Sequence, residues 1–213
     1  SIIKGMAVMV ESRDNSTGGH INRTSECVRV FIEQMKKDGS FDISESFENA
    51  IIKAAPMHDL GKIAVGSNTY APFDEDFATV KPGRFTPEEF EIMKQHAAKG
   101  AEIVEEVLKE SDDEEFKRIA INVAHYHHER WDGTGYPEGI KENMIPLEAR
   151  IMALADGFDA LVSKRVYKEK MSYDDAFKLI DEAGGTQFDP VLCKAFVACR
   201  PELEALYDSF EEA

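Results

Sequence analysis

The sequence has no apolar run close to the roughly 18 residues that a membrane-spanning helix needs. Positive charge is also scarce. The chain has 25 Lys and Arg against 41 Asp and Glu, so its formal net charge is −16. A chain this acidic is a poor candidate for contact with a nucleic-acid polymer or an anionic membrane surface. A small anionic ligand can still bind where a few basic side chains gather at one site.

Cysteine is rare as well. The chain has an odd number of cysteines, three, and their spacing fits no zinc motif: Cys27, Cys193 and Cys199. Two of the three lie within apolar stretches with helical spacing. The pattern therefore favours reduced, buried thiols in a cytoplasmic protein over a disulfide.

Alternating strand patterns of useful length are absent, and apolar residues recur at helical spacing instead. Such stripes cover residues 21–37, 45–57, 113–129 and 146–163. The string Thr86-Pro87-Glu88-Glu89 predicts a helix start, because its Thr can cap, its Pro suits the first turn and its last Glu can close a capping box. Two more helix starts are expected at Ser172 and at Asp189-Pro190. We predict an all-α fold with a single helical domain.

Two long stretches, 64–85 and 131–146, resist a helical interpretation because they are rich in glycine and proline. Loops of this length in a compact domain are usually functional. The acidic residues 66–78 either cover a site or project into solvent, and the sequence leaves both alternatives open. We expect residues 1–213 to be one domain of a longer protein with a sensory region upstream, and a homodimer stays an open alternative.

Six histidines carry the clearest chemical signal. Asp59 directly follows His58, His128 directly follows His127, and His20 comes after two glycines. Imidazole and carboxylate ligands together suit iron, manganese, zinc or nickel. Adjacent residues on a helix point about 100° apart, so the paired histidines would flank one pocket at a helix end. A carboxylate has two oxygens and can join two metals, which makes Asp59 the expected bridge.

Several motifs resemble those of a known family. His58-Asp59-Leu60-Gly61-Lys62 resembles the signature of the HD superfamily of metal-dependent phosphohydrolases, and His127 to Pro137 is similar to the hallmark of its HD-GYP branch. Further matches are His20-Ile21-Asn22-Arg23, Lys81-Pro82-Gly83 through His96, Ala155 to Leu161, Ser163 to Lys168, and Gly185 to Pro190. The resemblance covers about residues 5–200, and several motifs in the right order are far more specific than His-Asp alone.

The resemblance implies an all-helical phosphodiesterase that hydrolyses the bacterial second messenger cyclic di-GMP to pGpG, with further cleavage to GMP left open. It also implies two divalent metal ions that generate the attacking hydroxide, with iron or manganese favoured over zinc or nickel. The implied ligands of one metal are His20, His58, Asp59 and Asp156. Those of the other are Asp59, His96, His127 and His128. Some family members add a Glu four residues before the first histidine and hold three metals, so Ser16 at that position predicts two.

The resemblance also implies how substrate is held. Lys62, Arg165 and Lys168 match positions that contact the substrate phosphate, and Tyr136 lies in the loop expected to shape the guanine side of the pocket. Asp59 and Lys62 are the expected catalytic residues, with Lys62 holding a phosphate oxygen or protonating the leaving group. These cations matter because the net negative charge of the chain repels an anionic substrate.

Other residues near the motifs are expected to play supporting parts. Asp159 is expected to accept a hydrogen bond from a ligand, Arg23 and Glu129 to orient histidines, and His125 to lie at the pocket edge. Two other functions stay open. One is a phosphodiesterase for another cyclic dinucleotide, and the other is a catalytically weak module that binds partner proteins through residues 133–137. All ligands expected for two metals are present, which favours the enzyme.

Overall fold

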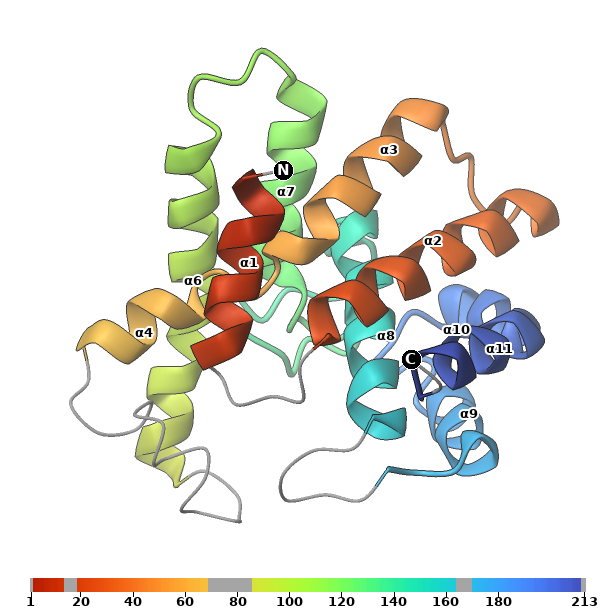
Figure 1. Ribbon diagram of the computed structural model, residues 1–213. Helices are drawn as coiled ribbons and strands as arrows, with labels where there is room; N and C mark the ends of the chain where they lie inside the picture. The colour runs from red at the N-terminus through yellow and green to blue at the C-terminus, as the bar shows by residue number, and fades with distance from the viewer. Residues whose placement is uncertain (1, 14–18, 69–85, 164–169, 212–213) are drawn as a thin grey trace.

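The computed structural model describes residues 2–13, 19–68, 86–163 and 170–211 (Figure 1). Three residues named from the sequence, Ser16, Arg165 and Lys168, lie outside the described residues. So does the acidic stretch from residue 69 onward.

The described residues form helices and no β-strand, which confirms the predicted all-α fold. The helices are α1 (Ile2–Arg13), α2 (His20–Asp38), α3 (Glu45–Ala54), α4 (Lys62–Asn68), α6 (Pro87–Val107), α7 (Glu114–Tyr126), α8 (Leu147–Val162), α9 (Tyr173–Glu182), α10 (Pro190–Ala198) and α11 (Arg200–Glu211). Two short 3₁₀ helices cover Ala55–Met57 and Glu142–Met144.

Helices α2 and α8 pack against each other in the middle of the molecule (Figure 1). Helices α6 and α7 lie side by side on one flank with α4 against α6, whereas α9, α10 and α11 gather on the other flank. An aromatic cluster joins the middle to that second flank. The Phe196 ring of α10 lies 5.0 Å from the Phe31 ring of α2 and 5.3 Å from the Phe158 ring of α8, measured between centroids. The central helices are therefore held from both flanks.

The helix starts predicted from sequence are confirmed. The Thr86 hydroxyl accepts from the Glu89 backbone N–H at 3.2 Å, and the Glu89 carboxylate accepts from the Thr86 N–H at 2.7 Å, which completes the capping box of α6. Ser172 and Asp189 cap α9 and α10 with their side chains. Gly39, with φ +65°, ends α2 in the left-handed region that favours glycine.

Two predicted helix ends are wrong, and both errors fall beside histidine motifs. The helix expected over 45–57 ends at Ala54 and tightens into a 3₁₀ turn, because Pro56 has no N–H to donate and crowds the preceding turn. The helix expected over 113–129 ends at Tyr126, and His127 is its C-cap. Both histidine pairs therefore lie at helix ends, where the chain turns.

The three cysteines are free and buried, as predicted. Burial raises the pKa of both Cys193 and Cys199 to about 12, so their thiols stay protonated and unreactive at neutral pH. None of the described helices combines the length and the apolar composition that crossing a bilayer requires.

Candidate metal centre

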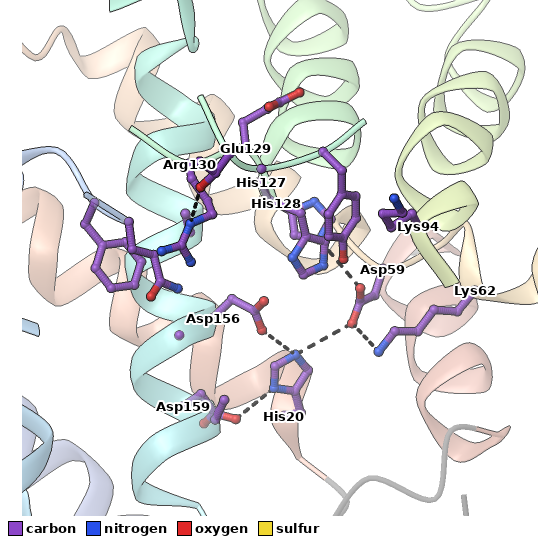
Figure 2. A pocket seen from close by; sticks show the side chains of 18 of the residues that line it. His20, Asp59, Lys62, Lys94, His127, His128, Glu129, Arg130, Asp156 and Asp159 are labelled. Carbon is purple, nitrogen blue, oxygen red and sulfur yellow. Dashed lines mark hydrogen bonds and ion pairs between the residues drawn. The ribbon is translucent and has the colours of Figure 1, made fainter. Parts of the chain in front are cut away.

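A pocket of about 470 Å³ lies between the start of α2, the turn at residues 58–61, α6, the end of α7 and the middle of α8. Figure 2 shows side chains from these segments turned toward one another around Asp59. His20 is the first residue of α2 and directly follows Gly19, whose φ of +98° gives the sharp turn expected there. The pocket thus collects residues that lie far apart in the sequence.

The turn that carries His58 and Asp59 lies unusually close to α6. A Cβ atom on Gly61 would lie 1.8 Å from the backbone oxygen of His96 and 2.5 Å from the backbone nitrogen of Gly100. Glycine at this position therefore lets the turn rest directly on the backbone of α6. The close approach places Asp59 beside His96.

Two imidazoles face one oxygen of Asp59, and the Asp156 carboxylate lies beside both of them. We name these four residues the first cluster: His20, His58, Asp59 and Asp156. The Nε2 atoms of His20 and His58 are 3.2 Å apart. His20 Nε2 lies 3.5 Å from Asp156 Oδ1, and His58 Nε2 lies 3.4 Å from Asp59 Oδ2. Figure 2 shows the His20 ring between the carboxylates of Asp59 and Asp156.

Three histidines surround the other oxygen of Asp59, and we name this set the second cluster: Asp59, His96, His127 and His128. Asp59 Oδ1 lies 3.5 Å from His96 Nε2 and 3.7 Å from His127 Nε2. The His96 and His128 rings lie 4.9 Å apart between centroids. Each residue of the second cluster offers one possible ligand atom, and these atoms lie within 4.8 Å of one another. The same holds for His20, His58 and Asp59 of the first cluster. Asp59 therefore stands between two sets of donors, the position required of a bridging carboxylate.

Four histidine rings are oriented by hydrogen bonds at their outer nitrogen. Each Nδ1 faces an acceptor: Asp159 Oδ2 for His20 (2.7 Å), and backbone oxygens of Ala55 for His58 (2.8 Å), Met93 for His96 (2.6 Å) and Val123 for His127 (2.9 Å). Carbonyl and carboxylate oxygens can only accept, so Nδ1 donates and, in a neutral ring, the Nε2 lone pair faces the cluster. Among the described residues, the buried Nε2 atoms of His96 and His127 have no hydrogen-bond partner. Such inward lone pairs fit a metal ion.

Asp159 fixes the orientation of His20, as predicted. Its Oδ1 accepts from Arg23 Nε at 2.7 Å, Tyr207 OH at 3.0 Å and Ser163 Oγ at 3.1 Å, while its Oδ2 accepts from His20. Burial disfavours the charged form of Asp159, but the hydrogen bonds from His20 and Arg23 outweigh burial and lower the pKa of this carboxyl. Arg23 thus acts on His20 through Asp159.

The charges of the two clusters differ. Burial by itself would lower the pKa of His58, but the carboxylates of Asp59 and Asp156 outweigh burial and raise this pKa to about 9. At His96 burial prevails and lowers the pKa to about 4. Burial also opposes ionisation of Asp59, yet Lys62, with its Nζ 2.8 Å from Asp59 Oδ2, and His58 together lower the pKa of that carboxyl. Without a cation, the first cluster holds a proton at neutral pH, whereas His96 is neutral.

This contrast predicts that metal affinity rises more steeply with pH at the first cluster than at the second. A metal at the first cluster must displace the proton of His58, whose pKa is about 9. We therefore expect the apparent dissociation constant of that cluster to fall about tenfold per pH unit from neutrality up to the pKa. His96, with a pKa of about 4, has no proton to lose in this range. Calorimetric titration of Mn²⁺ into metal-free protein at several pH values measures both, and equal pH slopes for the two clusters would contradict the assignment.

Stability without metal should change in the opposite direction. The pKa of His58 in the folded chain, about 9, exceeds its ordinary value of 6.5. The stabilisation from its charge is therefore fully present below pH 6.5 and is lost as the pH rises through about 9. Thermal unfolding of metal-free protein across this range is the matching measurement.

The other predicted residues divide into those that reach the pocket and those that do not. Lys62 and Tyr136 line it, and the Tyr136 ring stacks on the His128 ring at 4.8 Å between centroids. His125 pairs with Glu138 at 3.0 Å and is not one of the lining residues. The prediction that Glu129 orients a histidine is wrong. Its carboxylate accepts from the backbone N–H groups of Glu138 and Gly139 at 2.6 and 3.1 Å, so it shapes the loop after residue 130.

The lining residues that were not singled out from the sequence include Lys94, Arg130, Gln187 and Phe188. Arg130 and the Gln187-Phe188 pair stand inside motifs that were recognised, but nothing in their spacing indicated that they face the same cavity. Lys94 lies two residues before His96, in a helix with many other charged residues.

Comparison with known proteins identifies relatives along nearly the whole chain. A cyclic di-GMP phosphodiesterase of Vibrio cholerae is 38% identical over 213 residues, which are 99% of this chain and 42% of that protein. A cyclic di-GMP phosphodiesterase of Thermotoga maritima is 36% identical over 206 residues, 97% of this chain and 50% of that protein. The chain thus spans half the length of these relatives or less.

Solved structures share the fold. A cyclic GMP-AMP-specific phosphodiesterase of Vibrio cholerae superposes with a TM-score of 0.62 at 19% identity, over 95% of this chain and 50% of that one. The HD domain family matches residues 5–192. This match contains the His58-Asp59 turn, the histidines of both clusters and the glycine-rich loop that ends in Gly135-Tyr136-Pro137. The chain belongs to the HD domain family.

Proposed function

We propose that this chain is a metal-dependent phosphodiesterase that hydrolyses cyclic di-GMP to linear pGpG. The observation that carries the proposal is the position of Asp59, whose two oxygens face two separate sets of imidazole nitrogens at 3.4 to 3.9 Å. The relatives from Vibrio cholerae and Thermotoga maritima, which carry this activity in their names, support the choice of substrate.

The proposed cofactor is a pair of divalent cations, with iron or manganese favoured. His20, His58, Asp59 and Asp156 would hold one ion, and Asp59, His96, His127 and His128 the other. Bound divalent ions supply Lewis acidity toward the phosphoryl oxygens and lower the pKa of an attacking water. Mixed imidazole and carboxylate ligands suit these borderline metals better than they suit magnesium or calcium.

The side chains of this chain supply the rest of the proposed mechanism. Lys62 Nζ lies 2.8 Å from Asp59 Oδ2 and lines the pocket, so it can contact a phosphate oxygen next to the bridging carboxylate. Its positive charge offsets the repulsion that the acidic chain exerts on a phosphodiester. The Tyr136 ring, stacked on His128, offers a flat surface to a base. We propose Arg165 and Lys168 as further phosphate contacts, on the strength of the motif alone.

Incubation of purified, Mn²⁺- or Fe²⁺-loaded protein with cyclic di-GMP, with products separated by liquid chromatography and identified by mass, tests the function. Conversion to pGpG is the expected result, and the time course shows whether GMP follows. Chelation of the metal should stop the reaction, and adding Mn²⁺ back should restore it. Metal-loaded protein that leaves cyclic di-GMP intact would overturn the proposal.

A further inference from the structure

One wall of the pocket has no part in holding metals or the scissile phosphate. Arg130, Gln187 and Phe188 line it. Figure 2 shows Arg130 on the side of the pocket away from Lys62 and Lys94, with the clusters between them. Tyr136 belongs to the other wall, because its ring packs edge-on against Phe90 of α6 at 5.7 Å between centroids. A substrate with two bases around a central phosphodiester would therefore meet a different wall with each base.

The guanidinium of Arg130 is held in one orientation. Its Nε donates to Thr134 Oγ1 at 3.0 Å, and that hydroxyl donates to Asp132 Oδ1 at 2.6 Å. The backbone N–H of Asp132 in turn donates to the Thr186 oxygen at 2.9 Å. Across the part of the chain that the structure describes, the two terminal nitrogens of Arg130 make no hydrogen bond and no ion pair. The guanidinium has five N–H groups. The one on Nε holds it in place, and the four on the terminal nitrogens are available at the pocket.

Gln187 is fixed by its backbone and has an unused side chain. Its backbone oxygen accepts from the Trp131 N–H at 3.1 Å, and its own N–H donates to the Ala183 oxygen at 3.1 Å. The side-chain amide forms no hydrogen bond with any residue that the structure describes. The NH₂ donor and the carbonyl acceptor of the Gln187 side chain are therefore available in the same pocket as the Arg130 guanidinium.

The Phe188 ring joins this wall to the metal centre. A Cβ atom on Gly157 would lie 3.0 Å from the edge of that ring, so the ring rests on the backbone of α8. Gly157 directly follows Asp156 of the first cluster. Phe188 is 5% exposed, so the wall combines a small apolar edge, a forked donor and an amide within one pocket.

We infer that Arg130, Gln187 and Phe188 form a subsite that recognises one guanine of the substrate. The terminal N–H groups of Arg130 match the O6 and N7 acceptors of guanine, a pairing that arginine makes with guanine elsewhere. The Gln187 side-chain oxygen can accept from the N1 and N2 protons, and Phe188 provides apolar contact. Adenine has an amino donor where guanine has O6. That amino group would face the N–H donors of Arg130, so no hydrogen bond could form there. This inference rests on the proposed phosphodiesterase function and assigns its specificity.

A subsite for a single guanine sorts cyclic dinucleotides into two classes. Cyclic di-GMP and 3′3′-cGAMP both carry a guanine that can occupy the subsite, whereas cyclic di-AMP carries none. The expected order of kcat/KM therefore places the two guanine-containing substrates above cyclic di-AMP. Since binding of the base precedes chemistry, the discrimination should lie mainly in KM.

The test compares kcat and KM for these three substrates in metal-loaded wild-type protein and in Arg130→Met, Arg130→Lys and Gln187→Leu. We expect Arg130→Met to lower the preference for cyclic di-GMP over cyclic di-AMP by about tenfold or more, the discrimination that one bidentate contact supplies. Arg130→Lys should keep part of the preference, because an ammonium can still donate to O6 and N7 but lacks the planar fork. Gln187→Leu should reduce the preference by a smaller factor.

Lys94→Met is the matched control, because it removes a cation from the opposite wall and should leave the ratio between substrates unchanged. Equal losses on all three substrates in Arg130→Met would assign Arg130 to a phosphate or to loop structure and overturn the subsite. If the wild type cleaves none of the three, the proposed function fails. Equilibrium binding of the same ligands to wild type and Arg130→Met then decides the subsite separately.

Discussion

Asp59→Asn is expected to abolish hydrolysis and to release metal from both clusters. The two carboxylate oxygens of Asp59 face different sets of imidazoles, His58 at 3.4 Å on one side and His96 at 3.5 Å on the other. An asparagine keeps the shape but has one weakly basic oxygen and no charge, so it cannot serve two cations. We expect activity to fall at least about 10³-fold, as when a charge-stabilising group is removed from an active site.

Metal content by inductively coupled plasma mass spectrometry and turnover of cyclic di-GMP measure this effect together. Asp208→Asn is the matched control, because Asp208 is exposed on α11 and, within the part of the chain that the structure describes, accepts a side-chain hydrogen bond only from the Tyr173 hydroxyl. It should keep both metals and full turnover. An Asp59→Asn protein that still carries two metals and cleaves substrate would show that Asp59 is not the bridge.

Gly61→Ala is expected to destabilise the fold more than any other single methyl added to a described glycine. The new Cβ would lie 1.8 Å from the His96 backbone oxygen and 2.5 Å from the Gly100 nitrogen, far inside van der Waals contact. Both atoms belong to the backbone of α6, so no side-chain rotation can relieve the clash. We expect the free energy of unfolding to fall by about 3 kcal/mol or more, and metal content to fall with it as the turn moves away from α6.

Chemical denaturation of metal-free protein measures the stability change. Gly5→Ala serves as the control, because a Cβ at Gly5 in α1 meets no atom within 4 Å. That substitution should leave stability unchanged or raise it by about 0.5 to 1 kcal/mol, since alanine favours a helix over glycine. A Gly61→Ala protein as stable as wild type would mean that the turn does not need its close contact with α6.

Much of the candidate site could be named from the resemblance of short motifs to a known family. Each of the seven ligands named from the motifs lies within the two clusters that the structure brings together. The helix that begins at Pro87 was equally predictable, because Thr86 and Glu89 act locally through the capping box. Local signals of this kind are present in a short stretch of sequence, whatever the rest of the chain does.

Most of the omissions come from loops that fold back on themselves or meet distant segments. Arg130 and Gln187 share one wall only because the Trp131 N–H bonds to the Gln187 oxygen across 56 positions of sequence. Glu129 follows the His127-His128 pair, yet its carboxylate turns toward the loop because backbone donors await it there. A Cβ at Gly135 would lie 2.4 Å from the Arg130 nitrogen, so only a glycine lets the loop fold back this tightly. Such proximity cannot be predicted from the composition of either segment alone.

Helix α11 (Arg200–Glu211) lies beyond the residues that the HD domain family matches, yet it reaches the metal centre. The buried Tyr207 hydroxyl is 3.0 Å from Asp159 Oδ1, and the other oxygen of Asp159 is 2.7 Å from His20 Nδ1. The docking of α11 and the aim of His20 are therefore linked equilibria. If docking of α11 strengthens cation binding through His20, then cation binding must strengthen docking of α11 by the same free energy. Undocking of α11 would therefore lower the affinity for the cation by that amount.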